Sequence, residues 1–271
     1  MTVDGDDSID FVDFLNLMTP IIILLVVVFI GYYFLKGKRK PRTTTSNLVY
    51  KAILARYIPF YQTLNNADKL LFEQKVSDFL EGITIEGVGT AIEDTDRVMI
   101  ASSAVIPIFR LNNWRYSNLT NVILYPDTFD SEFQFEGENR NILGMVGSGY
   151  MNGQMILSRA ALTKGFSRSA GKENTAIHEF VHLLDKSDGA TDGIPENLLA
   201  HDYVLPWLKM IHHEIHQIEE GKSDINPYAA TSEAEFFAVA AEYFFQKPEE
   251  LKHKHPELYE MLFMMFMRVR R

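Results

Sequence analysis

Two histidines four residues apart, with a glutamate directly after the first, are the residues of this chain best suited to chemistry. His178, Glu179 and His182 form the pattern H-E-x-x-H, in which two imidazoles on one helix face bind a zinc ion. At about 100° per residue, positions i and i+4 lie almost in line along a helix, so both rings can reach one ion. Glu179 then points away from that line. It can hold a metal-bound water without binding the metal itself.

The residues around this pattern indicate a half-buried helix. Apolar side chains recur at i, i+3, i+4 and i+7 and form one stripe, made of Ile177, Phe180, Val181 and Leu184. The histidines and Asp185 occupy the neighbouring stripe, which we expect to face a cleft. Asp185 is a candidate partner for the second ring nitrogen of a ligand histidine. Because the pattern also occurs by chance in ordinary helices, the metal interpretation needs a third ligand.

A candidate third ligand lies downstream, in a segment that is apolar on every side except for two glutamates. Residues 234–245 predict a buried helix, and Glu235 and Glu242 lie on one stripe of it. A buried carboxylate needs a cation or strong donors to offset its lost hydration. Glu235 would complete a His-His-Glu zinc site with an open position for water. Alternatively, Ser232 and Glu235 form a capping box that only closes the helix start. We favour the ligand, with Glu242 as reserve ligand or partner of one histidine.

These motifs resemble the Mlc titration factor A (MtfA) family of zinc peptidases. The resemblance rests on His178–Asp185, on Asn226-Pro227-Tyr228-Ala229-Ala230-Thr231 and on Ala234–Val239, with weaker similarity upstream, so that it covers most of the chain after residue 46. It implies that His178, His182 and Glu235 bind zinc, that Glu179 is the catalytic base and that Tyr228 assists the reaction. It also implies a peptide or protein substrate and a transcriptional regulator as a cellular partner.

The composition limits the remaining possibilities. The chain has 271 residues, 46% of them hydrophobic, and a formal net charge of −10. This length suits one sizeable soluble domain with an appendage, and the acidic balance argues against direct nucleic acid binding. There are no cysteines, so disulfides and cysteine-bound zinc are excluded.

The first part of the chain departs from the family pattern because it predicts a membrane anchor. Residues 14–35 carry no charged side chain, and about 20 apolar residues suffice to span a bilayer. Five aspartates precede this run, while lysines and arginines follow it at 36–46, which disfavours a cleaved signal peptide. By the positive-inside rule, residues 1–13 lie outside the cell membrane. The basic linker 36–46 and the peptidase domain 47–271 then lie in the cytoplasm.

The remaining segments give a coarse expectation of secondary structure. Helix is expected from Asn47 to Leu80, with a break at Pro59, and a loop or hairpin over Asp127–Gly153. Strands are expected at Arg97–Ile100, Asn121–Tyr125 and Gln154–Ser158, the last as an edge strand that pairs with a peptide substrate. Lys252–His255 is expected to be a solvated loop.

Two further polar clusters are not expected to be functional sites. Asp185, Asp188 and Asp192 do not match a calcium-binding EF-hand loop and predict a solvated turn at the end of the zinc helix. His212 and His216 are four apart, but charged residues surround them and no buried carboxylate nearby completes a metal site.

The sequence therefore predicts an α+β, zincin-like metallopeptidase domain with one N-terminal transmembrane helix. The predicted function is membrane-anchored, zinc-dependent hydrolysis of peptide bonds at the cytoplasmic face. The alternative is a membrane-tethered regulatory protein that binds and sequesters a cytoplasmic partner such as a transcriptional regulator. An open coordination position beside an intact glutamate base favours the enzyme, because structural zinc is usually closed by four protein ligands.

Overall fold

The computed structural model describes Thr19, Val26 and residues 44–267, apart from 113, 136–139 and 148–151. The predicted N-terminal segment 1–13, transmembrane helix 14–35 and basic linker 36–46 lie almost entirely outside the described residues. Among those described, no helix has both the length and the apolar character needed to cross a membrane. Thr44–Arg271 forms one structural unit.

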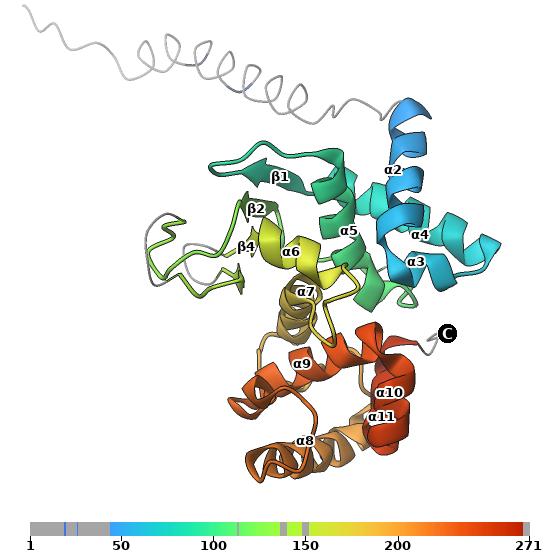
Figure 1. Ribbon diagram of the computed structural model, residues 1–271, viewed down its shortest axis with the longest axis vertical. Helices are drawn as coiled ribbons and strands as arrows, with labels where there is room; N and C mark the ends of the chain where they lie inside the picture. Colours follow the sequence, from blue (N-terminus) through green and yellow to red (C-terminus); the bar gives the residue numbers. More distant parts are fainter. Residues whose placement is uncertain are drawn as a thin grey trace, which may run out of the picture. The chain divides into compact units, whose positions relative to one another are not determined.

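Helices and a small sheet make up this unit (Figure 1). The strands are β1 (Thr84–Gly87), β2 (Asn121–Tyr125), β3 (Gly144–Val146) and β4 (Gln154–Ser158). The α-helices are α2 (Thr44–Tyr57), α3 (Pro59–Thr63), α4 (Asn66–Gly82), α5 (Asp94–Ile108), α6 (Arg159–Gly165), α7 (Thr175–Asp185), α8 (Val204–Glu219), α9 (Glu233–Gln246), α10 (Pro248–Lys254) and α11 (Pro256–Phe266). Short 3-10 helices are η2 (Lys186–Asp188), η3 (His201–Tyr203) and η4 (Pro227–Ala230). The predicted mixture of helix and sheet is confirmed, as is the helix break at Pro59.

The sheet has the strand order β1-β2-β4-β3. β1, β2 and β4 are parallel, and β3 runs antiparallel to β4. The expectation that Gln154–Ser158 is an edge strand is therefore wrong: β4 is a strand, but β2 and β3 cover its two sides. The edge strands are β1 and β3, and the three residues of β3 are too few to give a period-2 pattern in the sequence.

The run Arg97–Ile100 is also not a strand as predicted, since it lies within α5. A reciprocal capping box starts this helix, in which Glu93 and Asp96 each accept a hydrogen bond from the other's backbone. From Val98 to Ile108 every side chain of α5 is buried. A helix buried on all sides shows no 3.6-residue period, so its short apolar run has the same pattern as a strand.

α7 lies in the middle of the unit, between the sheet with its helices and the C-terminal helices α8–α11 (Figure 1). It packs against α5 on one side and α9 on the other. Its predicted apolar stripe is confirmed as core: Ile177, Phe180, Val181 and Leu184 are all buried. The C-terminal helices have an aromatic core of their own, with Trp207 of α8 against Phe236 and Phe237 of α9. Packing on α5 therefore fixes the position of α7, and packing on α8 fixes the position of α9.

Lys252–His255 is not a solvated loop either. Lys252, His253 and Lys254 form the last turn of α10, and the His255 side chain is largely enclosed. Its ring nitrogens lie 3.1 Å from Glu214 of α8 and 2.7 Å from Asp224. These carboxylates raise the pKa of His255 against the opposing effect of burial. The imidazole therefore joins α8 to the loop before η4.

Candidate metal centre

The two histidines of α7 point to one place. Asn174 caps the helix, because its side chain accepts the Ile177 N–H at 3.1 Å. One turn further on, His178 Nε2 and His182 Nε2 lie 3.0 Å apart. The helix register therefore brings two imidazole nitrogens together on the face beside the buried stripe.

Glu235 of α9 lies against both histidines. Its Oε2 is 2.9 Å from His178 Nε2 and 3.4 Å from His182 Nε2. One ligand atom from each of the three residues can be chosen so that all lie within 4.8 Å of one another. Ser232 does cap α9, since its side chain accepts the Glu235 N–H at 3.2 Å. The cap uses the backbone of Glu235, so its carboxylate can face the histidines at the same time.

Glu242, two turns along α9, holds His178 from its other side. Its Oε1 lies 2.8 Å from His178 Nδ1, and its Oε2 accepts the Asn174 N–H. A carboxylate at Nδ1 favours the tautomer that carries the proton there, which leaves Nε2 as a metal ligand. Glu242 thus joins α9 to the start of α7 and sets the orientation of the His178 ring.

The electrostatics of this cluster favour a positive charge. Burial alone would lower the pKa of His178, but hydrogen bonds with Glu235 and Glu242 raise it to about 10. Burial would raise the pKa of Glu235, yet the two histidines hold it well below its ordinary value. The glutamates therefore favour a positive charge on the His178 ring.

Glu179 lies beside the cluster and is 7% exposed. Burial raises its pKa, and the positive charge of His178 and His182 opposes that rise. The strand β3 passes directly over it: a Cβ added at Gly144 would lie 2.8 Å from Glu179 Cγ. Gly144 therefore allows the backbone of the sheet edge to approach the glutamate. Nothing in the sequence pattern marked this glycine.

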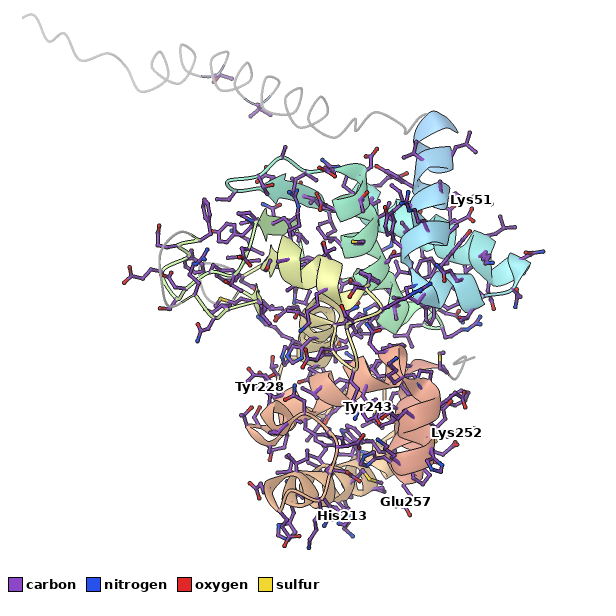
Figure 2. The ribbon with its side chains drawn as sticks, in the orientation of Figure 1. Lys51, His213, Tyr228, Tyr243, Lys252 and Glu257 are labelled. Carbon is purple, nitrogen blue, oxygen red and sulfur yellow. The ribbon has the colours of Figure 1, made fainter. Side chains whose placement is uncertain are left out.

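Tyr228 completes the surroundings from η4. Its ring centroid is 6.2 Å from that of His178, and its side chain is half exposed. Figure 2 shows it at the junction of α7 with the C-terminal helices. Burial and the negative charges of Glu235 and Glu179 raise its pKa, so the phenol keeps its proton. Asn226 fixes the turn, because its side chain accepts the Tyr228 N–H at 3.0 Å.

Asp185 is not bonded to a histidine as expected. Its Oδ2 accepts the Gly193 N–H at 2.8 Å, while its Oδ1 and His182 Nδ1 are buried without hydrogen-bond partners among the described residues. The Gly193 carbonyl accepts the indole N–H of Trp207 at 2.7 Å. A Cβ at Gly193 would lie 2.3 Å from the Glu233 carbonyl oxygen. This junction holds the start of α9, and with it Glu235, against the end of α7.

The other polar clusters have local roles. Asp188 and Asp192 accept backbone N–H groups of the turn after α7. His212 lies 3.4 Å from Glu233, and His216 lies 3.5 Å from Glu220, on largely exposed side chains. Within the described part of the chain, His178, His182 and Glu235 are the one group whose donor atoms converge for a metal ion.

This donor set fits zinc. Two imidazole nitrogens and one carboxylate oxygen are ligands that zinc accepts in hydrolytic sites, where a fourth position stays open for water or substrate. A carboxylate on the second nitrogen of a ligand histidine, as Glu242 provides for His178, is the usual support of such a site.

Comparison with known proteins agrees with this geometry. Residues 35–267 match the family described as glucose-regulated metallo-peptidase M90. An uncharacterized protein of Synechocystis is 31% identical over 224 residues, which are 79% of this chain and 81% of the relative. The Mlc titration factor A of Serratia proteamaculans is 30% identical over 64% of this chain and 69% of its own. That of Escherichia fergusonii is 28% identical over 75% of this chain and 80% of its own. The predicted resemblance is confirmed, and the chain belongs to the M90 metallopeptidase family, which includes the Mlc titration factor A proteins.

Proposed function

We propose that this protein is a membrane-anchored, zinc-dependent peptidase with a zincin-like active site. The observation that carries the proposal is the convergence of His178, His182 and Glu235, with the acidic side chain of Glu179 buried beside them. Membership of a metallopeptidase family supports it independently.

Each residue has a distinct task in this mechanism. His178, His182 and Glu235 would hold the zinc ion, which would act there as a Lewis acid that lowers the pKa of water and polarises a carbonyl. Glu179 takes the proton from the attacking water and gives it to the leaving amine. Burial raises the pKa of Glu179, which makes its carboxylate a stronger base for this exchange. Tyr228 donates a hydrogen bond to the oxyanion of the tetrahedral intermediate.

The open edge of β3 is the element that we assign to substrate binding, in place of β4. Leu143 and Gly147 form hydrogen bonds with the β4 side. In an antiparallel pair such residues alternate with residues whose groups point away, so the N–H and C=O of Gly144 and Val146 face outward. An extended peptide can pair with these groups. It would then run past Glu179, which lies against Gly144.

The membrane anchor rests on the sequence of residues 14–35. An uncharged apolar run of this length spans a bilayer as a helix. The basic residues at 36–46 place the peptidase domain in the cytoplasm. A peptidase at this position would act on substrates at the inner membrane surface.

A second candidate function is suggested by the name of the relatives, Mlc titration factor A. Their name states that those proteins titrate Mlc. On this alternative the chain binds and sequesters a cytoplasmic partner of that kind, a transcriptional regulator by family resemblance, without cleaving it. The two functions differ in whether Glu179 is needed.

The variant Glu179→Gln distinguishes hydrolysis from sequestration of a partner. We expect the full-length variant to keep bound zinc and to lose hydrolysis of a peptide library by about 10²–10⁴-fold, because only the proton transfer is removed. Zinc is measured by elemental analysis and turnover by mass spectrometry, with a chelator as a second control. Glu219→Gln, on the exposed side of α8, is the matched variant and should cleave normally. Normal cleavage by Glu179→Gln would refute the catalytic assignment.

A further inference from the structure

A cavity of about 610 Å³ lies between α4, the end of α5 and the chain that follows α5. It contains no residue of the candidate metal centre. Its volume is within the range of about 300–1,000 Å³ that is usual for small-molecule sites. We propose that this cavity binds a small organic anion, a carboxylate on an apolar body of about ten carbons.

The interior of the cavity suits an apolar body. Phe79 and Ile83 line one side of it, Val105 lines another, and Trp114 and Tyr116 come from the segment after α5. Aromatic walls of this kind pack well against a flat ring, edge to face or offset. An apolar ligand of the right size therefore buries its surface here.

The charges around the cavity call for an anion. The chain as a whole is acidic, with a net charge of −10, yet three basic side chains and only one acidic side chain, Asp78, are among the described residues that line this cavity. Arg110 forms a bidentate ion pair with Asp68, in which both hydrogen bonds are 2.7 Å long. Arg115 has no carboxylate partner among the described residues. Lys75 donates to the Leu111 carbonyl at 3.1 Å and has no carboxylate within ion-pair distance among the described residues. Burial lowers its pKa, and the charge of Asp78 opposes that shift.

Trp114 supplies a donor as well as an apolar wall. Its indole Nε1 is buried and has no hydrogen-bond acceptor among the described residues. A buried donor without a partner is unfavourable, and an oxygen of the ligand would satisfy it. Arg115, Lys75 and Trp114 thus offer two charges and one N–H group to a carboxylate at the cavity wall.

The cavity is connected to the helix of the metal centre, α7, through aromatic side chains. Phe79 and Tyr116 both contact Phe180, with ring centroids 5.7 and 5.2 Å away. Phe180 lies between the two histidines in α7 and is fully buried. A ligand that packs on Phe79 and Tyr116 is therefore one side chain away from the helix that holds the candidate ligands.

The test is direct binding to the full-length chain, so it does not depend on the proposed hydrolysis. Calorimetric titration with 1-naphthoate should show one site per chain. The neutral isostere 1-naphthamide should bind at least tenfold more weakly, and acetate should not bind. No binding of 1-naphthoate, or equal binding of naphthoate and naphthamide, would overturn the proposal.

Variants then locate the site. Arg115→Gln and Lys75→Met should each weaken naphthoate binding about tenfold, while Arg168→Gln, an exposed arginine outside the cavity, should leave it unchanged. Gly82 lines the cavity, and a Cβ added there would meet no atom within 4 Å. Gly82→Leu should therefore fold normally and block binding while all charges remain. If Gly82→Leu and the two charge variants bind like the unmodified chain, the ligand lies elsewhere and the proposal fails.

Discussion

At the scale of single residues, both ring nitrogens of His178 contact a glutamate of α9. Glu242 holds its Nδ1 at 2.8 Å, and Glu235 meets its Nε2 at 2.9 Å. The two glutamates are seven residues apart on α9, so one helix face reaches both sides of a single imidazole. Only Glu235 lies on the Nε2 side of the ring, where it could bind the same metal ion as His178. Glu242 fixes the orientation of the ring, so each of the two glutamates has a contact that offsets its burial in an otherwise apolar helix.

A comparison of Glu235→Ala with Ser232→Ala tests this division of roles. The first change removes the carboxylate beside both histidines, and we expect it to lower zinc occupancy strongly. The second removes only the helix cap, which costs about 1 kcal/mol of stability, so zinc should be retained. Metal content of the purified variants decides the matter. Equal zinc content in both would mean that Glu235 serves the helix start alone.

Tyr228→Phe isolates the phenol hydroxyl. If that hydroxyl acts only on the oxyanion, kcat should fall by about 10²–10³-fold with KM little changed. Because the side chain is half exposed, its substitution should leave the melting temperature and zinc content as they were. Steady-state kinetics on a defined peptide provide the measurement. An unchanged kcat would remove Tyr228 from the active site.

The sequence predicted those contacts that follow from spacing. The pattern His178, Glu179 and His182 places two rings together on any helix, and Glu235 stands out as a charge in an apolar segment. Asp185 is a candidate partner of a histidine by its spacing, but its carboxylate accepts the Gly193 N–H instead. That contact depends on a turn with a left-handed glycine at φ 76°, which spacing along a helix cannot reveal.

At the scale of elements, the short strand β3 matters more than its length suggests. It contributes the outward-facing backbone groups of Gly144 and Val146 and passes over Glu179. The sequence predicted a loop or hairpin over the range that contains it, and assigned the sheet edge to Gln154–Ser158. Strand order is set by contacts between distant segments, so a local pattern could identify β4 as a strand without placing it inside the sheet.

Two proline variants distinguish the two sides of β3. Val146→Pro removes an N–H that faces outward, and proline is tolerated at such a position of an edge strand. We expect KM for extended peptides to rise about 5- to 10-fold, the equivalent of one hydrogen bond, with the fold intact. Met145→Pro removes the N–H that faces β4, so it should lower the melting temperature instead. If Val146→Pro leaves KM unchanged, the peptide does not pair with β3 at this residue.

At the scale of the whole molecule, the candidate site lies where two groups of helices meet. α7 packs on α5 and is buried through Phe180, while α9 packs on α8 through Phe236 and Phe237. The turn at Gly193 and the ion pairs of Asp224 with Lys172, Lys254 and His255 tie the loops between them. The family and the mixed fold were predictable because motifs carry them. The approach of α9 to α7 followed from placing Glu235 beside the two histidines. The contacts of Gly193 and Asp224 that hold the loops were not predictable, since they depend on long-range packing.

The orientation of the chain in the membrane is the remaining prediction, and it follows from charge alone. Residues before position 14 include Asp4, Asp6 and Asp7, whereas Lys36, Lys38, Arg39, Lys40 and Arg42 follow the apolar run. Basic residues remain on the cytoplasmic side during insertion. A protease added to intact cells or right-side-out vesicles should therefore leave residues 47–271 uncut, and it should digest them once detergent opens the membrane. Digestion of the domain in intact vesicles would place the peptidase outside and reverse the topology.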